Sequence, residues 1–197
     1  MRIGFDFDNT IVDYTPVFTK IANDLGLKYE NNPKNSIKYY FENELDNPSS
    51  WKEVQLQVYC ELINSIKPSD KLSDLIKWLI DYNHDFFIVS HKTQTIKSGN
   101  SKTNLREPAN KWIENNLPLF KKERIFFESS ALAKVRKINS LRLDYFVDDL
   151  LTILKHHQFP KETKKILFNS TTNKDKKFYK ASSWDEVKKI ILDNEKH

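Results

Sequence analysis

Phe5-Asp6-Phe7-Asp8-Asn9-Thr10 is the stretch that decides the fold of this chain. It ends a short apolar run that begins at Arg2, and carboxylates follow the run at once. A short apolar run without alternation is typical of a parallel strand that helices cover on both faces. The stretch therefore predicts a buried parallel strand with acidic side chains at its carboxyl end.

Four further runs of the same kind follow along the chain. The five predicted strands are Arg2–Asp6, Asp85–Ser90, Arg124–Phe127, Asp144–Asp148 and Lys165–Phe168. Amphipathic helical patterns lie between them, and strands that alternate with helices form a parallel sheet covered on both faces. We therefore predict an α/β fold with a doubly wound parallel sheet and a Rossmann-like core.

One interval is too long for this alternation. Residues 7–84 separate the first two strands, and a bare loop of such length is uncommon inside a compact domain. Its aromatic and Asn-rich part, residues 13–67, suits a small helical insertion better. We therefore expect an α/β core of residues 1–12 and 68–197 and a helical insertion of residues 13–67.

The composition is that of a folded cytoplasmic protein. Hydrophobic residues make up 39% of the 197 residues and charged residues 30%. No run approaches the roughly 18 apolar residues that span a bilayer. Asp6 and Asp8 interrupt the first apolar run, so a signal peptide is not expected. The single Cys60 allows no internal disulfide.

The formal charge of +5 raises the question of nucleic-acid binding. The lysines are scattered, however, and the densest cluster, Lys174, Lys176 and Lys177, has no accompanying binding motif. We interpret it as a solvated surface that suits an anionic substrate. We expect neither nucleic acid nor a membrane as a partner.

Ligands of open parallel sheets bind beyond the carboxyl ends of the strands. The polar residues delivered there are Asp6, Asp8, Thr10, Ser90, His91, Lys92, Asp148 and Asp149, with Lys134 and Lys137 on the helix after the third strand. Clustered carboxylates repel one another unless a cation neutralises them. Oxygen ligands without His or Cys partners favour Mg²⁺.

This set predicts phosphoryl chemistry. A carboxylate such as Asp6 can attack phosphorus and form an aspartyl-phosphate. A carboxyl two residues further on can protonate the leaving oxygen and then activate water. Ser90 and a lysine would bind the phosphoryl oxygens. The residues thus indicate a magnesium-dependent phosphate-ester hydrolase.

The ordered motifs resemble those of the haloacid dehalogenase (HAD) superfamily, over almost the whole chain. The four motifs are Asp6-Phe7-Asp8-Asn9-Thr10, Ser90, Lys134 and Asp148-Asp149. A subgroup of small HAD hydrolases looks similar in three segments. These are Phe87-Ile88-Val89-Ser90-His91-Lys92-Thr93, Leu105-Arg106 with Trp112, and Tyr145-Phe146-Val147-Asp148-Asp149-Leu150.

The resemblance implies a role for each motif residue. Asp6 would be the nucleophile, Asp8 the general acid and base, and Lys134 the catalytic lysine. The implied metal ligands are Asp6, Asp8 (through its backbone carbonyl), Asp148 and Asp149. Thr10 would support the loop and Ser90 would hold the phosphate. The insertion of residues 13–67 would be a cap that excludes water and selects the substrate.

Several alternatives stay open at this point. Lys137 competes with Lys134, although a helix capped by Ser130 would place Lys134 in its first turn. His91, Lys92 and Arg106 are candidates for substrate binding, but His91 can be structural and Arg106 can form a surface ion pair.

Three functions also stay open. The main hypothesis is hydrolysis of a small phosphomonoester, a sugar phosphate or a nucleoside monophosphate, through phosphorylated Asp6. A phosphomutase would pass the same phosphoryl group back to a sugar, and a non-catalytic HAD-like binding protein would have lost the chemistry. The substrate itself depends on residues 13–67.

Overall fold

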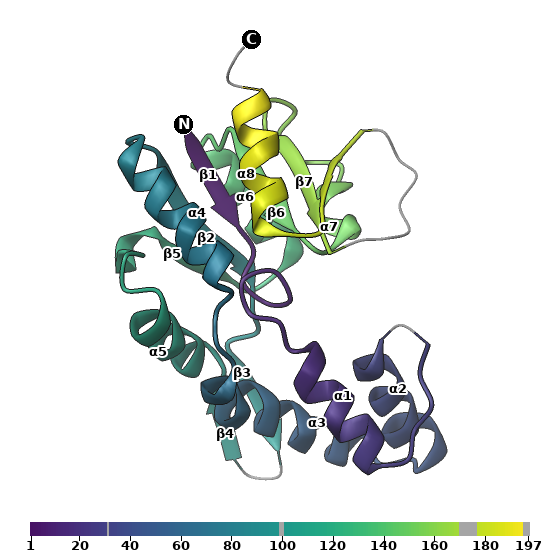
Figure 1. Ribbon diagram of the computed structural model, residues 1–197. Coiled ribbons are helices and arrows are strands. Elements are labelled where there is room, and N and C mark those ends of the chain that lie inside the picture. Colours follow the sequence, from purple (N-terminus) through teal and green to yellow (C-terminus); the bar gives the residue numbers. More distant parts are fainter. Residues whose placement is uncertain (31, 99–100, 170–176, 195–197) are drawn as a thin grey trace. The chain divides into compact units, whose positions relative to one another are not determined.

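The computed structural model describes residues 1–30, 32–98, 101–169 and 177–194. Lys174 and Lys176 of the lysine cluster lie outside these residues. The chain forms two compact units, each assembled from separate segments (Figure 1). The core unit comprises Met1–Val12, Pro68–Lys92 and Leu117–His197, and the second unit comprises Asp13–Lys67 and Thr93–Asn116. Among the described residues, no helix combines the length and the apolar character that crossing a membrane requires.

A six-stranded parallel sheet is the centre of the core unit, with the strand order β5-β2-β1-β6-β7-β8. The strands are β1 (Arg2–Phe5), β2 (Asp85–His91), β5 (Ile125–Glu128), β6 (Tyr145–Asp148), β7 (Lys164–Phe168) and β8 (Tyr179–Ala181). The five predicted strands are confirmed. β8 was not predicted, because it has only three residues and two of them are exposed.

β1 lies between β2 and β6 and contributes to both faces of the sheet. The Phe5 ring lies on one face, with its centroid 5.7 Å from that of Trp184. Gly4 points to the other face, against the side chains of Leu143 and Phe146. Because both faces are covered, the strand reads as a continuous apolar run rather than an alternating one.

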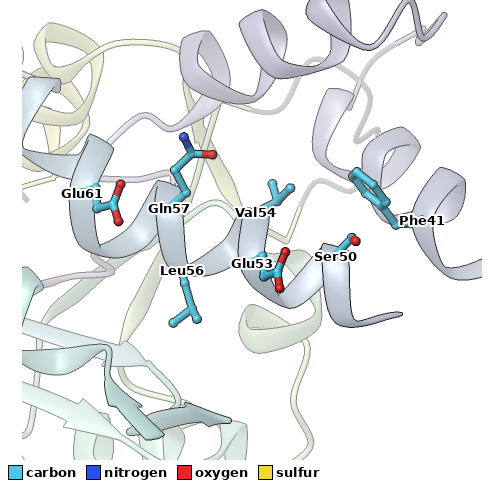
Figure 2. A pocket seen from close by; sticks show the side chains of 7 residues that line it. All are labelled: Phe41, Ser50, Glu53, Val54, Leu56, Gln57 and Glu61. Atoms are coloured by element: carbon cyan, nitrogen blue, oxygen red, sulfur yellow. The ribbon is translucent and has the colours of Figure 1, made fainter. Parts of the chain in front are cut away.

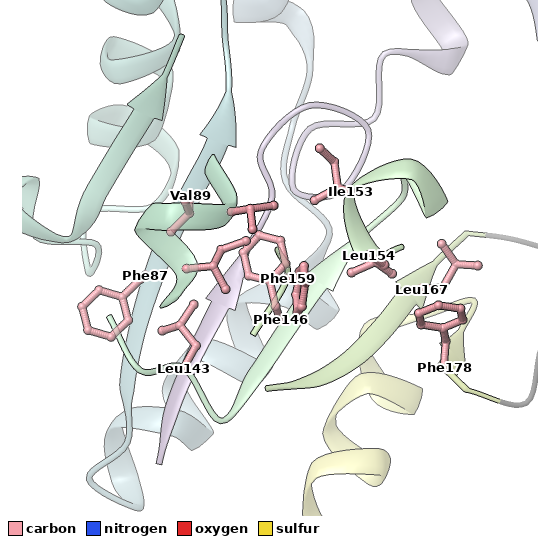
Figure 3. Close-up of a cluster of buried hydrophobic side chains, with 11 residues drawn as sticks. Phe87, Val89, Leu143, Phe146, Ile153, Leu154, Phe159, Leu167 and Phe178 are labelled. Carbon is pink, nitrogen blue, oxygen red and sulfur yellow. The ribbon is translucent and has the colours of Figure 1, made fainter. Parts of the chain in front are cut away.

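Helices cover both faces, as the doubly wound prediction requires. They are α4 (Asp70–Asp81), α6 (Ala131–Ser140), α7 (Leu151–Leu154) and α8 (Trp184–Asp193), with a 3₁₀ turn at Lys122–Arg124. Figure 3 shows the cluster that joins α6 and α7 to the sheet. There Val135 of α6 and Leu154 of α7 are buried with Phe146 of β6. On the opposite face, α8 packs against α4 and brings Trp184 to Phe5.

The second unit is mainly helical. Its helices are α1 (Thr15–Asp24), α2 (Pro33–Tyr39), α3 (Pro48–Leu56) and α5 (Arg106–Asn116), with π-helical turns at Tyr40–Glu44 and Gln57–Glu61 and a 3₁₀ turn at Leu62–Ser65. Pro16 lies in the first turn of α1, and Gly26 follows the end of this helix with φ +68°. Trp51 is buried beside Phe18, whereas Tyr39 is 58% exposed.

Thr93–Asn116 is a difference from the sequence expectation, which assigned this segment to the core. It forms a hairpin, β3 (Thr95–Ser98) with β4 (Ser101–Asn104), and then α5. The Trp112 indole N–H donates a hydrogen bond to the Ile66 carbonyl at 2.8 Å, which anchors α5 within the second unit. The hairpin is polar, so it contains no apolar run from which strands are predicted.

The tight packing at Gly4 predicts a destabilising substitution. In Gly4→Ala, the new Cβ would lie 2.7 Å from Phe146 Cδ2 and closer still to Leu143 Cδ1, and both neighbours are buried. We expect a loss of about 1–3 kcal/mol in the free energy of unfolding, as for other overpacked cores, measured by urea denaturation. Equal stability of Gly4→Ala and the wild type would contradict this account of the sheet.

Candidate active site

The chain turns sharply after β1. The Asp6 amide donates to the Val147 carbonyl at 2.9 Å, which extends the pairing of β1 with β6 by one residue. The amides of Ile11 and Val12 both donate to the Phe7 carbonyl, at 3.1 and 3.0 Å. Asn9 adopts φ 58°, a left-handed conformation that Asn tolerates better than most residues. These bonds fix the backbone that carries Asp6 and Asp8.

Lys134 is the centre of the site. Its Nζ donates to Asp6 Oδ1 and to Asp148 Oδ2, both at 2.6 Å, and its side chain is 1% exposed. The Ser130 hydroxyl caps α6 by accepting a bond from the Ala133 amide at 3.1 Å, which places Lys134 in the first turn. Lys137 Nζ lies instead 4.4 Å from the centroid of the Phe126 ring. Of the two candidate lysines, the structure brings Lys134 to the carboxylates.

Three carboxylates gather at the ends of β1 and β6. Asp6, Asp148 and Asp149 each offer an oxygen, and these oxygens lie within 4.8 Å of one another. Asp148 Oδ1 also accepts a bond from the Leu150 amide at 2.8 Å. Asp149 Oδ1 is buried and has no hydrogen-bond partner among the described residues. A buried, unpartnered oxygen in an all-oxygen set fits a hard divalent cation.

The pKa values of the clustered groups are shifted by burial and by the neighbouring charges. Burial raises the pKa of Asp6 to about 6, against the lowering effect of Lys134. Burial also raises the pKa of Asp149, to about 8, and the charges of Asp6 and Asp148 raise it further. Burial alone would lower the pKa of Lys134, but its two carboxylate partners outweigh burial and raise it. A bound cation would relieve this repulsion.

Asp8 makes a separate ion pair. Lys92 Nζ lies 2.9 Å from Asp8 Oδ1 and 3.0 Å from Oδ2, and the Lys92 side chain is 3% exposed. The sequence reading made Lys92 a substrate-binding candidate and did not foresee this pair.

The other predicted site residues fall into two groups. The Ser90 Oγ and Thr10 Oγ1 atoms are buried in the core unit and have no hydrogen-bond partner among the described residues. His91 ends β2 and is exposed. Arg106 begins α5 in the second unit, where its amide donates to Asn104 Oδ1 at 3.0 Å.

The second unit has a surface hollow of about 470 Å³ (Figure 2). Its lining residues come from α3 and the two π-helical turns: Phe41, Ser50, Glu53, Val54, Leu56, Gln57 and Glu61. Two are acidic and none is basic, so the hollow does not suit a phosphate. The chemistry-bearing residues belong to the core unit instead.

Comparisons with known proteins agree with this geometry. A family model described as 5′ nucleotidase, deoxy (pyrimidine), cytosolic type C protein matches residues 1–196. No curated protein sequence matches the chain.

Solved structures of HAD hydrolases resemble the whole chain. A HAD family hydrolase from Deinococcus radiodurans, with bound phosphate and sodium, has a TM-score of 0.63 at 10% identity, over 98% of this chain and 95% of that one. A family IA HAD hydrolase from Entamoeba histolytica has a TM-score of 0.61 at 15% identity, over 94% of both chains. A predicted phosphatase from Clostridium acetobutylicum has a TM-score of 0.60 at 16% identity, over 98% of both chains. At these identities the likeness shows the fold.

The bridging position of Lys134 predicts a large effect of its removal. Lys134→Met would leave the buried Asp6 and Asp148 carboxylates without their shared cation. We expect a loss of about 3–5 kcal/mol in the free energy of unfolding, measured by urea denaturation in EDTA at pH 8. Lys137→Met is the matched control from the same helix and should change stability by less than about 1 kcal/mol. Equal losses in the two variants would be incompatible with the observed pairing.

The raised pKa of Asp149 predicts how stability depends on pH without metal. In the unfolded chain this carboxyl has its ordinary pKa of 3.8, whereas in the folded protein burial raises the pKa to about 8, so the proton is kept to that pH. The folded state therefore binds more protons in this window, so the free energy of unfolding should fall as pH rises through it.

A divalent cation should reverse this loss. Its ligands must be deprotonated, so saturating Mg²⁺ should raise the melting temperature more at pH 8 than at pH 5.5, by about 5 °C or more. Differential scanning fluorimetry with Mg²⁺ and with EDTA measures this. Asp149→Asn is the control, and it should be more stable than the wild type in EDTA at pH 8 yet gain little from Mg²⁺. An equal Mg²⁺ effect at both pH values would count against the site.

Proposed function

We propose that this protein removes the 5′-phosphate from deoxyribonucleoside monophosphates. The chain belongs to the cytosolic type C 5′ nucleotidase family and is a HAD-type phosphoric monoester hydrolase. One observation carries the proposal in the structure. Asp6, Lys134, Asp148 and Asp149 form a buried cluster, and the hydroxyl of Ser90 is buried in the same unit with an unused hydrogen-bonding atom. That arrangement suits the binding and transfer of a phosphoryl group.

The proposed cation is Mg²⁺. Asp6, Asp148 and Asp149, with the backbone carbonyl of Asp8, would hold it, since Mg²⁺ prefers oxygen ligands and often keeps several waters. When bound, it would neutralise charge on the phosphoryl oxygens and on the carboxylates. Lys134 remains necessary beside it, because its ammonium holds Asp6 and Asp148 in place.

In the first step, a carboxylate oxygen of Asp6 attacks phosphorus. The bond between phosphorus and the 5′-oxygen breaks, and the leaving oxygen takes a proton from the Asp8 carboxyl. The free nucleoside departs, and the phosphoryl group stays on Asp6 as an acyl phosphate. The hydroxyl of Ser90 supplies a hydrogen bond to the phosphoryl oxygens, and Thr10 is the proposed support of the loop that carries Asp8.

In the second step, the Asp8 carboxylate takes a proton from water as the water oxygen attacks phosphorus. The bond between phosphorus and Asp6 breaks, inorganic phosphate leaves, and both carboxyl groups return to their starting state. A mutase would use a sugar hydroxyl in place of this water. The family match favours water as the acceptor.

The substrate class follows from the family description. It names deoxy and pyrimidine nucleotides, so a deoxypyrimidine 5′-monophosphate is the proposed substrate. Residues 13–67 are the proposed cap that selects it, and His91 and Arg106 are proposed substrate contacts. The same description names a cytosolic type, and we propose a cytoplasmic location.

Activity should depend on both Mg²⁺ and Asp6. Purified protein with Mg²⁺ should release inorganic phosphate from dUMP or dTMP, and EDTA should abolish the release. Asp6→Asn should lower kcat roughly a thousandfold or more, because the amide cannot attack phosphorus. A panel of deoxy- and ribonucleotides and sugar phosphates, ranked by kcat/KM, tests the substrate class.

Circular dichroism of Asp6→Asn would show that the fold is kept. Wild-type turnover by Asp6→Asn would exclude the aspartyl-phosphate. A higher kcat/KM for sugar phosphates than for all nucleotides would exclude the proposed substrate while leaving the mechanism in place.

A further inference from the structure

We propose that Lys92 is the positioning residue of Asp8, holding the acid–base carboxyl apart from the metal ligands. This inference rests on the proposed function, because it assigns a role within that reaction. It replaces the sequence-based hypothesis that Lys92 binds substrate. Its basis is the ion pair in which Lys92 Nζ lies 2.9 and 3.0 Å from the two oxygens of Asp8.

Both partners are anchored by backbone bonds of the core unit. The Lys92 amide donates to the Glu128 carbonyl at 3.0 Å, which continues the pairing of β2 with β5. Asp8 forms a bridge with Val12 at the base of the turn after β1. The Lys92 side chain is also buried, so its freedom is already restricted before it pairs, unlike that of a lysine in a surface ion pair.

The environment of the Lys92 ammonium also favours a fixed position. Its side chain is 3% exposed, compared with 25% for Asp8. Its Nζ lies 5.6 Å from the centroid of the fully buried Phe7 ring, within the range of a cation–π contact. The lysine is thus the buried member of the pair, and the carboxyl is the accessible one. An accessible carboxyl held by a buried cation can meet a substrate.

The two lysines divide the carboxylates between them. Lys134 binds Asp6 and Asp148, whereas Lys92 binds Asp8. Among the described residues, the group of oxygens close enough to share an ion includes those of Asp6, Asp148 and Asp149 but not those of Asp8. Without Lys92, the Asp8 carboxyl would lose its fixed position and could no longer meet the leaving oxygen as an acid.

This role predicts an effect that depends on the leaving group. When an alkyl ester such as a nucleotide reacts, the leaving oxygen needs the Asp8 proton as its bond to phosphorus breaks. A p-nitrophenolate ion leaves without a proton, so the transfer of phosphoryl to Asp6 does not need Asp8. The attack of water on phosphorylated Asp6 needs Asp8 for both substrates.

The experiment compares wild type, Lys92→Met and Lys92→Arg with dUMP and with p-nitrophenyl phosphate. For Lys92→Met we expect kcat with dUMP to fall about 100-fold, with KM changed less than threefold. With p-nitrophenyl phosphate, rapid mixing should show a burst of about one nitrophenolate per protein, followed by slow turnover. Lys92→Arg can still pair with Asp8 and should recover at least a tenth of the activity.

Two controls accompany these kinetics: Mg²⁺ affinity measured by calorimetry, and a variant of a lysine outside the site. Mg²⁺ affinity should stay within threefold of wild type in Lys92→Met. Lys164→Met is the matched control, because Lys164 Nζ pairs with the Tyr145 hydroxyl at the opposite ends of the strands, and its kinetics should equal those of wild type. If Lys92→Met does not fold, the test uses Lys92→Arg instead, with its kcat and its nitrophenolate burst measured in the same way.

Each outcome has one reading. A raised KM for both substrates without a burst would make Lys92 a substrate ligand and overturn the proposal. Equal loss of kcat with both substrates, again without a burst, would make it merely structural and overturn the proposal. If the wild-type protein turns over neither substrate, the proposed function and the role of Lys92 are both refuted. If the wild type is active, the variants test the role of Lys92 alone.

Discussion

The ammonium group shared by Asp6 and Asp148 is the contact on which the core unit depends. Lys134 reaches it from α6, Asp6 lies at the end of β1, and Asp148 at the end of β6. Two adjacent strands, β1 and β6, and helix α6 are therefore joined at one atom. Such a buried pair is stable only when both partners are present, because either charge left alone would be costly to bury.

Even with this contact, the site keeps an excess of negative charge when its carboxyl groups are ionised. Asp6, Asp8, Asp148 and Asp149 carry four charges when ionised, and Lys92 and Lys134 return two. The remainder of two equals the charge of one divalent cation. The raised pKa values of Asp6 and Asp149 and the unpartnered oxygen of Asp149 express this imbalance in the protein without metal. This charge balance agrees with the proposal that the site binds one divalent cation.

Much of the fold could be predicted from the sequence, because the central strands are covered on both faces. β1, β2, β6 and β7 read as apolar runs, and the acidic residues after β1 and β6 marked the ligand edge of the sheet. β8 and the β3–β4 hairpin were not predictable in this way. The hairpin is polar and has no apolar run, and β8 is short and pairs with β7, from which it is separated in the chain.

The site was predictable in its members more than in its contacts. Spacing from the Ser130 cap identified Lys134, because helix geometry is regular and the cap fixes its start. No comparable rule linked Lys92 to Asp8, which are 84 residues apart in the chain. The assignment of α5 to the second unit was not predicted for a similar reason. The hydrogen bond from Trp112 to Ile66 joins segments that are separate in the sequence.

The division of the chain into units has a consequence for exchanging parts between relatives. The second unit is not one insertion but two, and the chain passes between units after Val12 and after Lys92. Both junctions directly follow elements of the active site, the turn that carries Asp8 and the lysine that pairs with it. A chimaera that inherits a foreign second unit must therefore accept two grafts whose seams adjoin the acid–base pair. Under the proposed roles, such recombination would change the cap and the surroundings of the proton-transfer pair together.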